Sequence, residues 1–162
     1  MSEAPVHVVP YDPSWIDKFE SEKTFLEPLL APWRKGPIEH VGSTAVVGLC
    51  AKPVIDIMVG VTSLSESEPA KDILRQSGYQ YAEYKTNVMH WFCKPSFAMR
   101  THHLHLVPFE SPLWNERLAF RDLKLFWSCL SFQEPIITSG TSPRSTRGNS
   151  LRLSYAANSI WA

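Results

Sequence analysis

The spacing of hydrophobic and polar residues changes along this chain, and the change separates predicted helices from predicted strands. Asp12-Pro13 is typical of a helix N-cap followed by the first helical residue, and Trp15 and Phe19 then begin an apolar stripe at helical spacing. Gly78 is typical of a helix C-terminus, and Ser111-Pro112 of another helix start. Helices are therefore predicted at about 13–33, 69–77 and 111–127.

Runs of β-branched and aromatic residues predict the strands, which are expected at 6–9, 37–41, 54–61, 79–84, 88–93 and 102–107. The run 54–61 is nearly all apolar, so it is expected to be buried on both faces, and its one charged residue is Asp56. The runs 79–84 and 88–93 are expected to form a hairpin. The order β-α-β-β-α-β-β-β-α predicts a mixed α/β (α+β) domain with helices packed against one sheet.

The composition changes near the C-terminus. Of the 162 residues, 44% are hydrophobic and 20% are charged, which is typical of a globular chain. Residues 128–162, however, include eleven Ser or Thr and only four charged residues. We therefore predict one domain over residues 1–127 and a weakly ordered Ser/Thr-rich tail over residues 128–162.

Charge and cysteine content exclude several classes of protein. Sixteen basic and sixteen acidic residues give a formal net charge of zero, which disfavours a general nucleic-acid binder. The sequence shows neither a secretory signal nor an apolar run long enough to span a membrane, so no membrane partner is expected. Cys50, Cys93 and Cys129 form no CxxC pair, which favours reduced thiols in a cytoplasmic protein. The oligomeric state stays open.

A turn and a carboxylate form the first candidate site. At Gly42-Ser43 the glycine lets backbone N–H groups approach a phosphate, and the hydroxyls of Ser43 and Thr44 add donors. Asp56, on the next predicted strand, could hold a divalent metal against that phosphate. The alternative is a tight turn and an aspartate whose oxygens are satisfied by backbone donors.

Histidines form the second candidate. Because side chains alternate across a strand, His103 and His105 share one face, whereas His102 points to the other. Two such imidazoles could bind one metal or handle protons and phosphate; the alternative is a histidine pair without a ligand. His40 could complete a metal site with Asp56, although a hydrogen bond to the adjacent turn is the favoured interpretation.

Basic residues near these motifs suit an anionic ligand. Lys52 lies four residues before Asp56, and Arg117 and Arg121 lie on one face of the last predicted helix. Lys52 and Arg121 are candidates for binding phosphate or carboxylate. For Arg117, a solvated surface charge is the favoured interpretation.

Several of these motifs occur together in one known family. In order and spacing over about residues 6–123, the chain resembles the GrpB family in VVPYDPSW (8–15), IEHVGSTAV (38–46), AKPVIDI (51–57), HLHLV (103–107) and FRD (120–122). The resemblance implies a nucleotidyltransferase-like mixed sheet with helices packed against it, similar to the palm of DNA polymerase beta. It also implies that the Gly-Ser turn and Asp56 correspond to the signature of that superfamily.

The chain departs from the superfamily pattern at Met58. An active nucleotidyltransferase has a second carboxylate two residues after the first, and Met58 occupies that position here. A thioether is a poor magnesium ligand, which disfavours a two-magnesium transfer and favours a single softer metal such as zinc, manganese or iron. Metal-free proton chemistry by histidine is the other option. A second departure is the Ser/Thr-rich tail.

The sequence supports three hypotheses. In the first, the protein binds a phosphate-bearing or acidic small molecule, a nucleotide included, in a cleft with Asp56, His103 and His105, with or without a divalent metal, as a transferase would. In the second, the same residues perform acid–base chemistry such as hydrolysis, cyclisation or isomerisation. In the third, the protein is a catalytically inactive relative that binds a ligand. Whether the protein is an enzyme is left open, because a fold alone does not decide a function.

Overall fold

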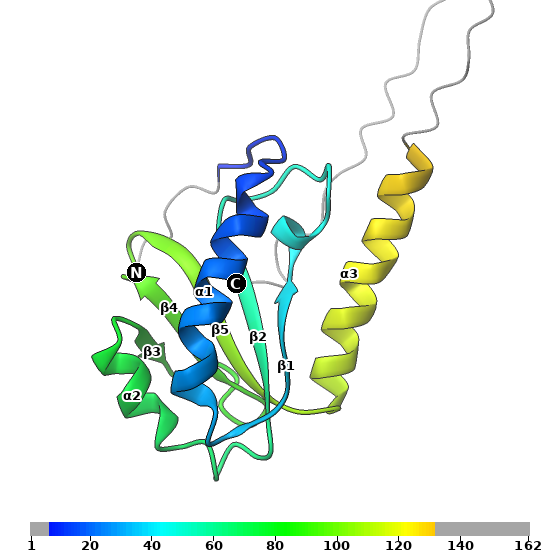
Figure 1. Ribbon diagram of the computed structural model, residues 1–162. Helices are drawn as coiled ribbons and strands as arrows, with labels where there is room; N and C mark the ends of the chain where they lie inside the picture. The colour runs from blue at the N-terminus through cyan, green and yellow to red at the C-terminus, as the bar shows by residue number, and fades with distance from the viewer. Residues whose placement is uncertain (1–6, 132–162) are drawn as a thin grey trace, which may run out of the picture.

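A five-stranded mixed sheet forms the centre of the computed structural model, which describes residues 7–131 and the side chains of residues 7–124 (Figure 1). The strands are β1 (Arg34–Val41), β2 (Ile55–Val61), β3 (Gln80–Ala82), β4 (His90–Pro95) and β5 (Arg100–Pro108). Their spatial order is β1-β2-β5-β4-β3. β2 and β5 are parallel, and the other neighbours are antiparallel. The predicted fold class is confirmed, as is the hairpin of β3 and β4.

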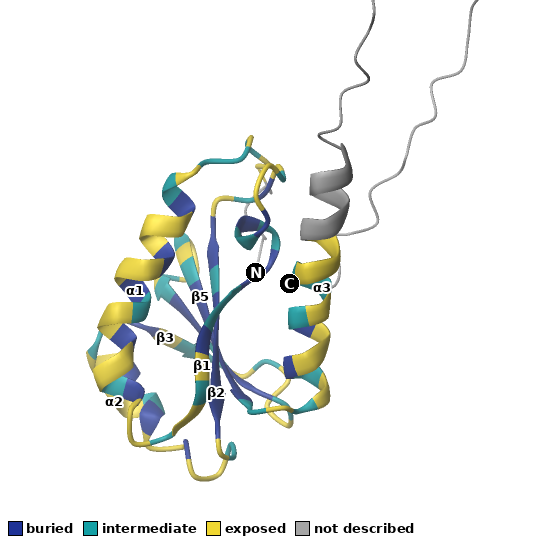
Figure 2. Ribbon diagram, turned by 45° about the vertical axis from the view of Figure 1, so that its right-hand side comes forward, coloured by how far each residue is buried: buried dark blue, intermediate teal, exposed yellow. Residues whose placement is uncertain are grey.

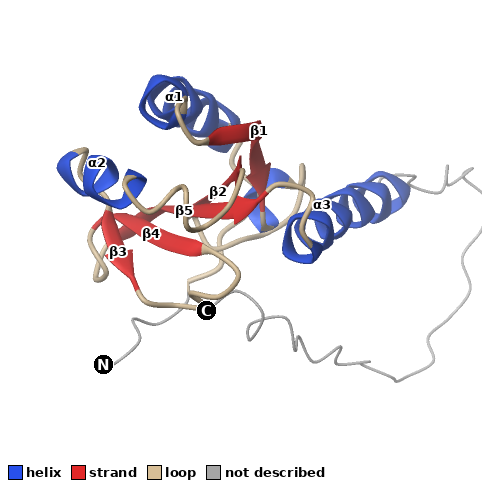
Figure 3. Cartoon of the chain, turned by 90° about the horizontal axis from the view of Figure 1, so that it is seen from below, coloured by secondary structure: helices blue, strands red, loops and turns tan. Residues whose placement is uncertain are grey.

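Helices cover both faces of this sheet. They are α1 (Ser14–Leu30), α2 (Ala70–Gln76) and α3 (Pro112–Ser131), with a short 3-10 helix, η1 (Ser43–Ala45). Figures 2 and 3 show α1 and α2 on one face and α3 on the other, at the β1 end of the sheet. The α3 helix continues past its predicted end at Trp127, and the rest of the predicted tail, residues 132–162, lies outside the described residues.

The start of α1 follows the sequence prediction. The carboxylate of Asp12 accepts hydrogen bonds from the backbone N–H of Ser14 (2.9 Å) and from its hydroxyl (2.7 Å), and so caps the first turn. The strand predicted before this helix is wrong within the described residues. Only a single bridge forms there, between Val9 and Ala51, and Pro10 has no N–H with which to extend a ladder.

Strand alternation divides the core into two clusters. On the α1 side, alternate residues of β2 pack with β5 and the helices: Ile55, Ile57, Val59, Val61, Leu104 and Leu106. On the α3 side, Met58 is fully buried with Val41, Met89, Val107 and Trp114. The strand β2 is thus buried on both faces, as predicted, and Met58 is part of an apolar cluster.

Two further predictions from composition can be compared with the structure. Among the residues that the structure describes, none of the helices combines the length and the apolar character needed to cross a bilayer. Cys50 is exposed and Cys93 is buried, and both are free thiols.

A buried ion pair fixes α1 to the sheet. Glu22 is only 7% exposed. Its Oε1 accepts a hydrogen bond from the hydroxyl of Tyr79 (2.7 Å), and its Oε2 pairs with the ammonium of Lys94. That ammonium also lies 5.3 Å from the centre of the Tyr79 ring. Both carboxylate oxygens of Glu22 are therefore satisfied away from water.

This cluster yields a stability prediction. In Lys94→Met, the Glu22 carboxylate would stay buried without its counter-charge, so we expect the free energy of unfolding to fall by about 3 kcal/mol. Lys23→Met is the control, because Lys23 pairs with Glu20 in solvent (3.4 Å), and its loss should cost less than about 1 kcal/mol. Urea unfolding measures both values, and equal losses would contradict the interpretation.

Candidate functional site

Three candidate site residues, Asp56, His103 and His105, meet where β1 ends and β2 and β5 begin. Asp56 is the second residue of β2, and it pairs with Val41 of β1 on one side and with His103 of β5 on the other. His105 lies two residues further along β5, beside Met58. Alternation therefore places all three side chains on the α3 face, so the predicted shared face of the two histidines is confirmed.

The carboxylate lies within contact distance of both imidazoles. Nδ1 of His103 is 2.9 Å from Oδ1 of Asp56, and Nε2 of His105 is 3.6 Å from the same oxygen. One candidate ligand atom from each residue lies within 4.8 Å of the other two. The side chain of Asp56 is 15% exposed, and both imidazoles are buried. These three residues are called the Asp56 cluster below.

The electrostatics of the cluster favour a carboxylate beside neutral imidazole. Burial alone would raise the pKa of Asp56, but the contacts from His103 and His105 outweigh burial and hold that pKa well below its usual range. Burial, and then the charge of Arg117, lower the pKa of His105 to about 4. At neutral pH, His105 therefore has a nitrogen lone pair.

Arg117 is a site residue that the sequence analysis missed. Its side chain is buried, with the residue 5% exposed, and Nη1 lies 3.5 Å from Nε2 of His105. The interpretation as a solvated charge is therefore wrong. The available signal was its position three residues after Trp114, on the helix face that turns to the sheet.

Within the part of the chain whose side chains are described, the outer nitrogens of the two histidines lack hydrogen-bond partners. Nε2 of His103 and Nδ1 of His105 are buried, and neither has a hydrogen-bond partner among the described residues. A buried polar atom without a partner is costly. Asp56 therefore contacts only one nitrogen of each imidazole, Nδ1 of His103 and Nε2 of His105.

Glycine is required at the turn beside Asp56. Gly42 follows β1 with φ 75° and ψ −171°, a region that only glycine adopts readily. A Cβ atom at this position would lie 2.5 Å from Oδ2 of Asp56. The turn therefore lies directly against the carboxylate, and the partly exposed Ser43 follows it.

Thr44 and His40 stabilise this turn. The hydroxyl of Thr44 donates to the carbonyl of Val54 (3.2 Å), and its oxygen lies 3.1 Å from Nε2 of His40. Since the hydroxyl has one hydrogen, His40 is the donor in the second contact. The His40 ring stacks on Phe19 of α1 at 4.7 Å, on the opposite face from Asp56. The structure thus places His40 outside the group of possible metal ligands, and it places the Thr44 hydroxyl inside the fold.

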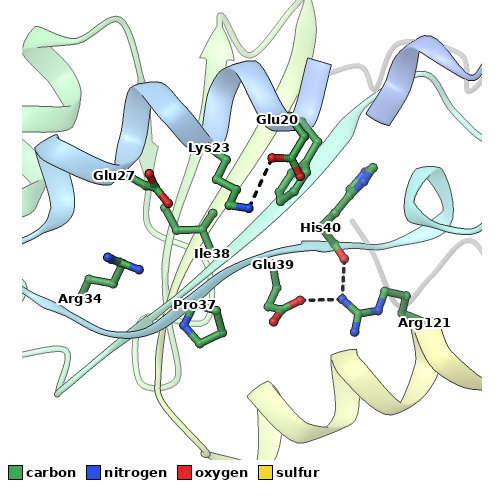
Figure 4. Close-up of a pocket in the computed structure, with 10 residues that line it drawn as sticks. Glu20, Lys23, Glu27, Arg34, Pro37, Ile38, Glu39, His40 and Arg121 are labelled. Carbon is green, nitrogen blue, oxygen red and sulfur yellow. Dashed lines mark hydrogen bonds and ion pairs between the residues drawn. The ribbon is translucent and has the colours of Figure 1, made fainter. Parts of the chain in front are cut away.

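Arg121, a predicted ligand-binding residue, contacts groups outside the cluster. Nη1 of Arg121 donates to Glu39 (2.7 Å) and to the carbonyl of His40 (3.1 Å), as Figure 4 shows. These residues line a groove of about 400 Å³ between α1, β1 and α3. The ammonium of Lys52 forms no hydrogen bond or ion pair with any described residue.

The expected cleft does not coincide with either of two grooves beside the sheet. The larger is the groove of Arg121, and the other, of about 320 Å³, lies between α1 and His102. His102 is thus on the far face, as predicted. Neither groove is lined by the Asp56 cluster.

Comparison with known proteins links most of the chain to one family. The family model described as GrpB protein matches residues 5–124. The glutamate-rich protein GrpB of Alkalihalophilus pseudofirmus is 35% identical over 122 residues, which cover 72% of this chain and 70% of that protein. A UPF0157 protein of Pseudomonas aeruginosa is 37% identical over 121 residues, but the match spans only 49% of its length.

A solved structure agrees with the fold. The crystal structure of conserved protein GrpB from Enterococcus faecalis aligns with a TM-score of 0.69 and 30% identity, covering 77% of this chain and 76% of that one. The mixed sheet with helices on both faces is consistent with the nucleotidyltransferase-like fold that the resemblance implied.

Gly42 supports a first prediction for the site. We expect Gly42→Ala to displace the Asp56 carboxylate and to lower the free energy of unfolding by more than the 1–3 kcal/mol, roughly, of backbone strain alone. Gly78→Ala is the matched control, because Gly78 also has a positive φ of 89° but open space around its Cβ position. Urea unfolding measures both, and a loss in Gly42→Ala no larger than in Gly78→Ala would contradict the close approach.

His40 supports a second prediction. Burial lowers the pKa of His40 to about 4, from 6.5. The unfolded chain therefore binds more protons between these values, and the contribution of His40 to stability is present above pH 6.5 and lost as the pH falls toward 4. Glutamine keeps a donor but does not titrate, so the unfolding free energy of His40→Gln should fall less than that of the wild type over this range. Parallel curves would contradict the assignment.

Proposed function

The chain belongs to the GrpB family, and we propose that its Asp56 cluster binds one divalent transition-metal ion and, beside it, a phosphate-bearing or acidic small molecule. The observation that carries this proposal is the contact of one oxygen of Asp56 with both histidines, at 2.9 and 3.6 Å. A nucleotide is one member of this class of anionic ligands.

The donor set fits a metal of the zinc class. One carboxylate and two imidazoles are typical zinc ligands, and two ligand atoms of a tetrahedral site with bonds of about 2.0–2.1 Å lie about 3.4 Å apart. The two measured separations lie on either side of that value. His105 offers a lone pair because its pKa is low. When bound, such a metal would polarise a phosphoryl or carboxyl oxygen as a Lewis acid.

Met58 limits the site to one ion. It occupies the position two residues after Asp56, where a second carboxylate would hold a second magnesium. Its side chain is fully buried against Met89 and Trp114. The side chain at this position packs in an apolar cluster and offers no oxygen ligand. We therefore propose a single metal ion, bound by one carboxylate and two imidazoles.

Charge favours an anionic ligand. Imidazoles that bind a metal through a lone pair add no charge, and the negative charge of Asp56 balances the positive charge of Arg117. A divalent ion would therefore leave two positive charges in a poorly solvated place. An anion compensates them. The backbone at Gly42 adjoins the carboxylate, and we expect the N–H groups of this turn and the hydroxyl of Ser43, the next residue, to donate to such a group.

A second candidate function needs no metal. Nδ1 of His103 donates to Asp56, which orients the ring and leaves Nε2 as the proton acceptor. Nε2 has no partner among the described residues. A carboxylate that orients a histidine in this way is typical of general acid–base catalysis, and it would suit hydrolysis, cyclisation or isomerisation. A ligand-binding protein without catalysis is the remaining alternative.

The test is metal analysis of protein purified without chelator, followed by titration with Zn²⁺, Mn²⁺ and Fe²⁺. We expect the wild type to bind one ion. Asp56→Asn and His105→Ala should each weaken that binding at least about tenfold, because even residues that only hydrogen-bond to metal ligands change the metal affinity by that factor. His102→Ala is the control, because His102 points to the opposite face. A thermal shift reports the same binding, worth about 2.7 kcal/mol at a hundredfold excess over Kd.

Two results would contradict the metal assignment. One is a wild type that binds none of the three ions, and the other is unchanged binding in both Asp56→Asn and His105→Ala. If the wild type binds no metal but turns over a substrate, and His103→Gln loses that turnover, acid–base catalysis replaces the metal site as the proposed function. Folding of each variant is checked by its far-UV and near-UV circular dichroism.

A further inference from the structure

An aromatic shelf adjoins the Asp56 cluster on the same face of the sheet. Its central residue is Trp91 of β4, whose ring centre lies 5.1 Å from that of His103. Phe97, in the turn between β4 and β5, lies nearly parallel to Trp91, at 6.3 Å and 17°. Tyr84 meets Trp91 edge-on at 6.4 Å. Tyr84, Trp91 and Phe97 are called the aromatic shelf.

The shelf faces solvent, which is unusual for so much aromatic surface. Phe97 is 44% exposed, and the neighbouring Met99 is 72% exposed. Trp91 and Tyr84 are partly exposed. Figure 3 shows α3 at the β1 end of the sheet, away from β3 and β4, and α1 and α2 on the opposite face. Exposed apolar side chains that gather in one place mark a binding surface more often than scattered ones do.

Cationic side chains lie over the aromatic rings. The guanidinium carbon of Arg100 is 5.5 Å from the centre of the Trp91 ring, and its Nε donates to the carbonyl of Phe97 (3.1 Å). The ammonium of Lys85 is 5.2 Å from the centre of the Tyr84 ring. The shelf therefore combines aromatic surface, of which Phe97 is the most exposed part, with positive charge held over Trp91 and Tyr84. This combination suits a flat ring attached to an anionic group.

We propose that the ligand of this protein carries a flat heteroaromatic ring, which stacks on the aromatic shelf while its anionic group lies at the Asp56 cluster. This inference rests on the proposed function, since it assigns a second part to the same ligand. The contact of Trp91 with His103 makes the two surfaces continuous. One molecule of moderate size can therefore occupy both.

Three probes separate the ring from the anion. Adenosine has the ring alone, ribose 5-phosphate has the anion alone, and adenosine 5′-monophosphate has both. Saturation-transfer NMR and calorimetry with the full chain measure their binding. We expect the monophosphate to bind more tightly than either part, and we expect saturation to reach the protons of the purine ring.

Two phenylalanines provide matched variants. Phe97→Ala should weaken adenosine and the monophosphate about tenfold each and leave ribose 5-phosphate unchanged. Phe25→Ala is the control, because Phe25 is also 44% exposed but lies on α1, on the other face. Both residues are exposed, so neither change should prevent folding. Trp91→Leu extends the series toward the centre of the shelf.

The outcomes distinguish this inference from the function on which it rests. The inference is overturned if adenosine and the monophosphate do not bind, or if Phe97→Ala leaves their affinities unchanged, as it would if the shelf served a protein partner instead. The proposed anion site is overturned if ribose 5-phosphate does not bind and the phosphate adds nothing to adenosine. Loss of all three affinities in Phe97→Ala alone would show a structural role and would also overturn the inference.

Discussion

The burial of one carboxylate determines much of this structure. Asp56 lies near the start of a strand that is otherwise apolar on both faces, and an ionised group there is tolerated only with partners. Nδ1 of His103 supplies the closest one, at 2.9 Å. The turn at Gly42 can approach only because that residue has no side chain. The identity of the residues around Asp56 thus follows from the need to compensate a single charge.

The sequence predicted the secondary-structure elements better than it predicted the contacts between them. Alternation in β5 was enough to separate His102 from His103 and His105, because it depends on neighbouring residues alone. The pairing of Asp56 with His103 joins residues 47 positions apart, and strand periodicity gives no information on which strands are adjacent. The expectation of one cleft with Asp56, His103 and His105 rested on the alternation in their two strands, and the direct contact between Asp56 and His103 was not predicted.

Side chains that depend on docking were the least predictable. Whether Arg117 is solvated or buried depends on how α3 lies against the sheet, and the charge alone favoured solvent. Arg121, one turn later, is a candidate ligand-binding residue from sequence, and its contacts with Glu39 and the carbonyl of His40 could not be predicted from the local pattern. Of the strand expected at 6–9, only the bridge between Val9 and Ala51 forms within the described residues. In each case the outcome depends on a tertiary neighbour that the local pattern does not contain.

The contact between Arg121 and the backbone has a consequence for the behaviour of the protein in solution. β1 is an outer strand of the sheet, and an outer strand offers unpaired backbone groups to strands of other molecules. Here the carbonyl of His40 is taken by Arg121, that of Gly36 accepts from Arg34 (3.4 Å), and Pro37 has no N–H to donate. The β1 edge of the sheet is thereby a poor template for pairing with a strand of another molecule, and the contact made by Arg121 contributes to this protection.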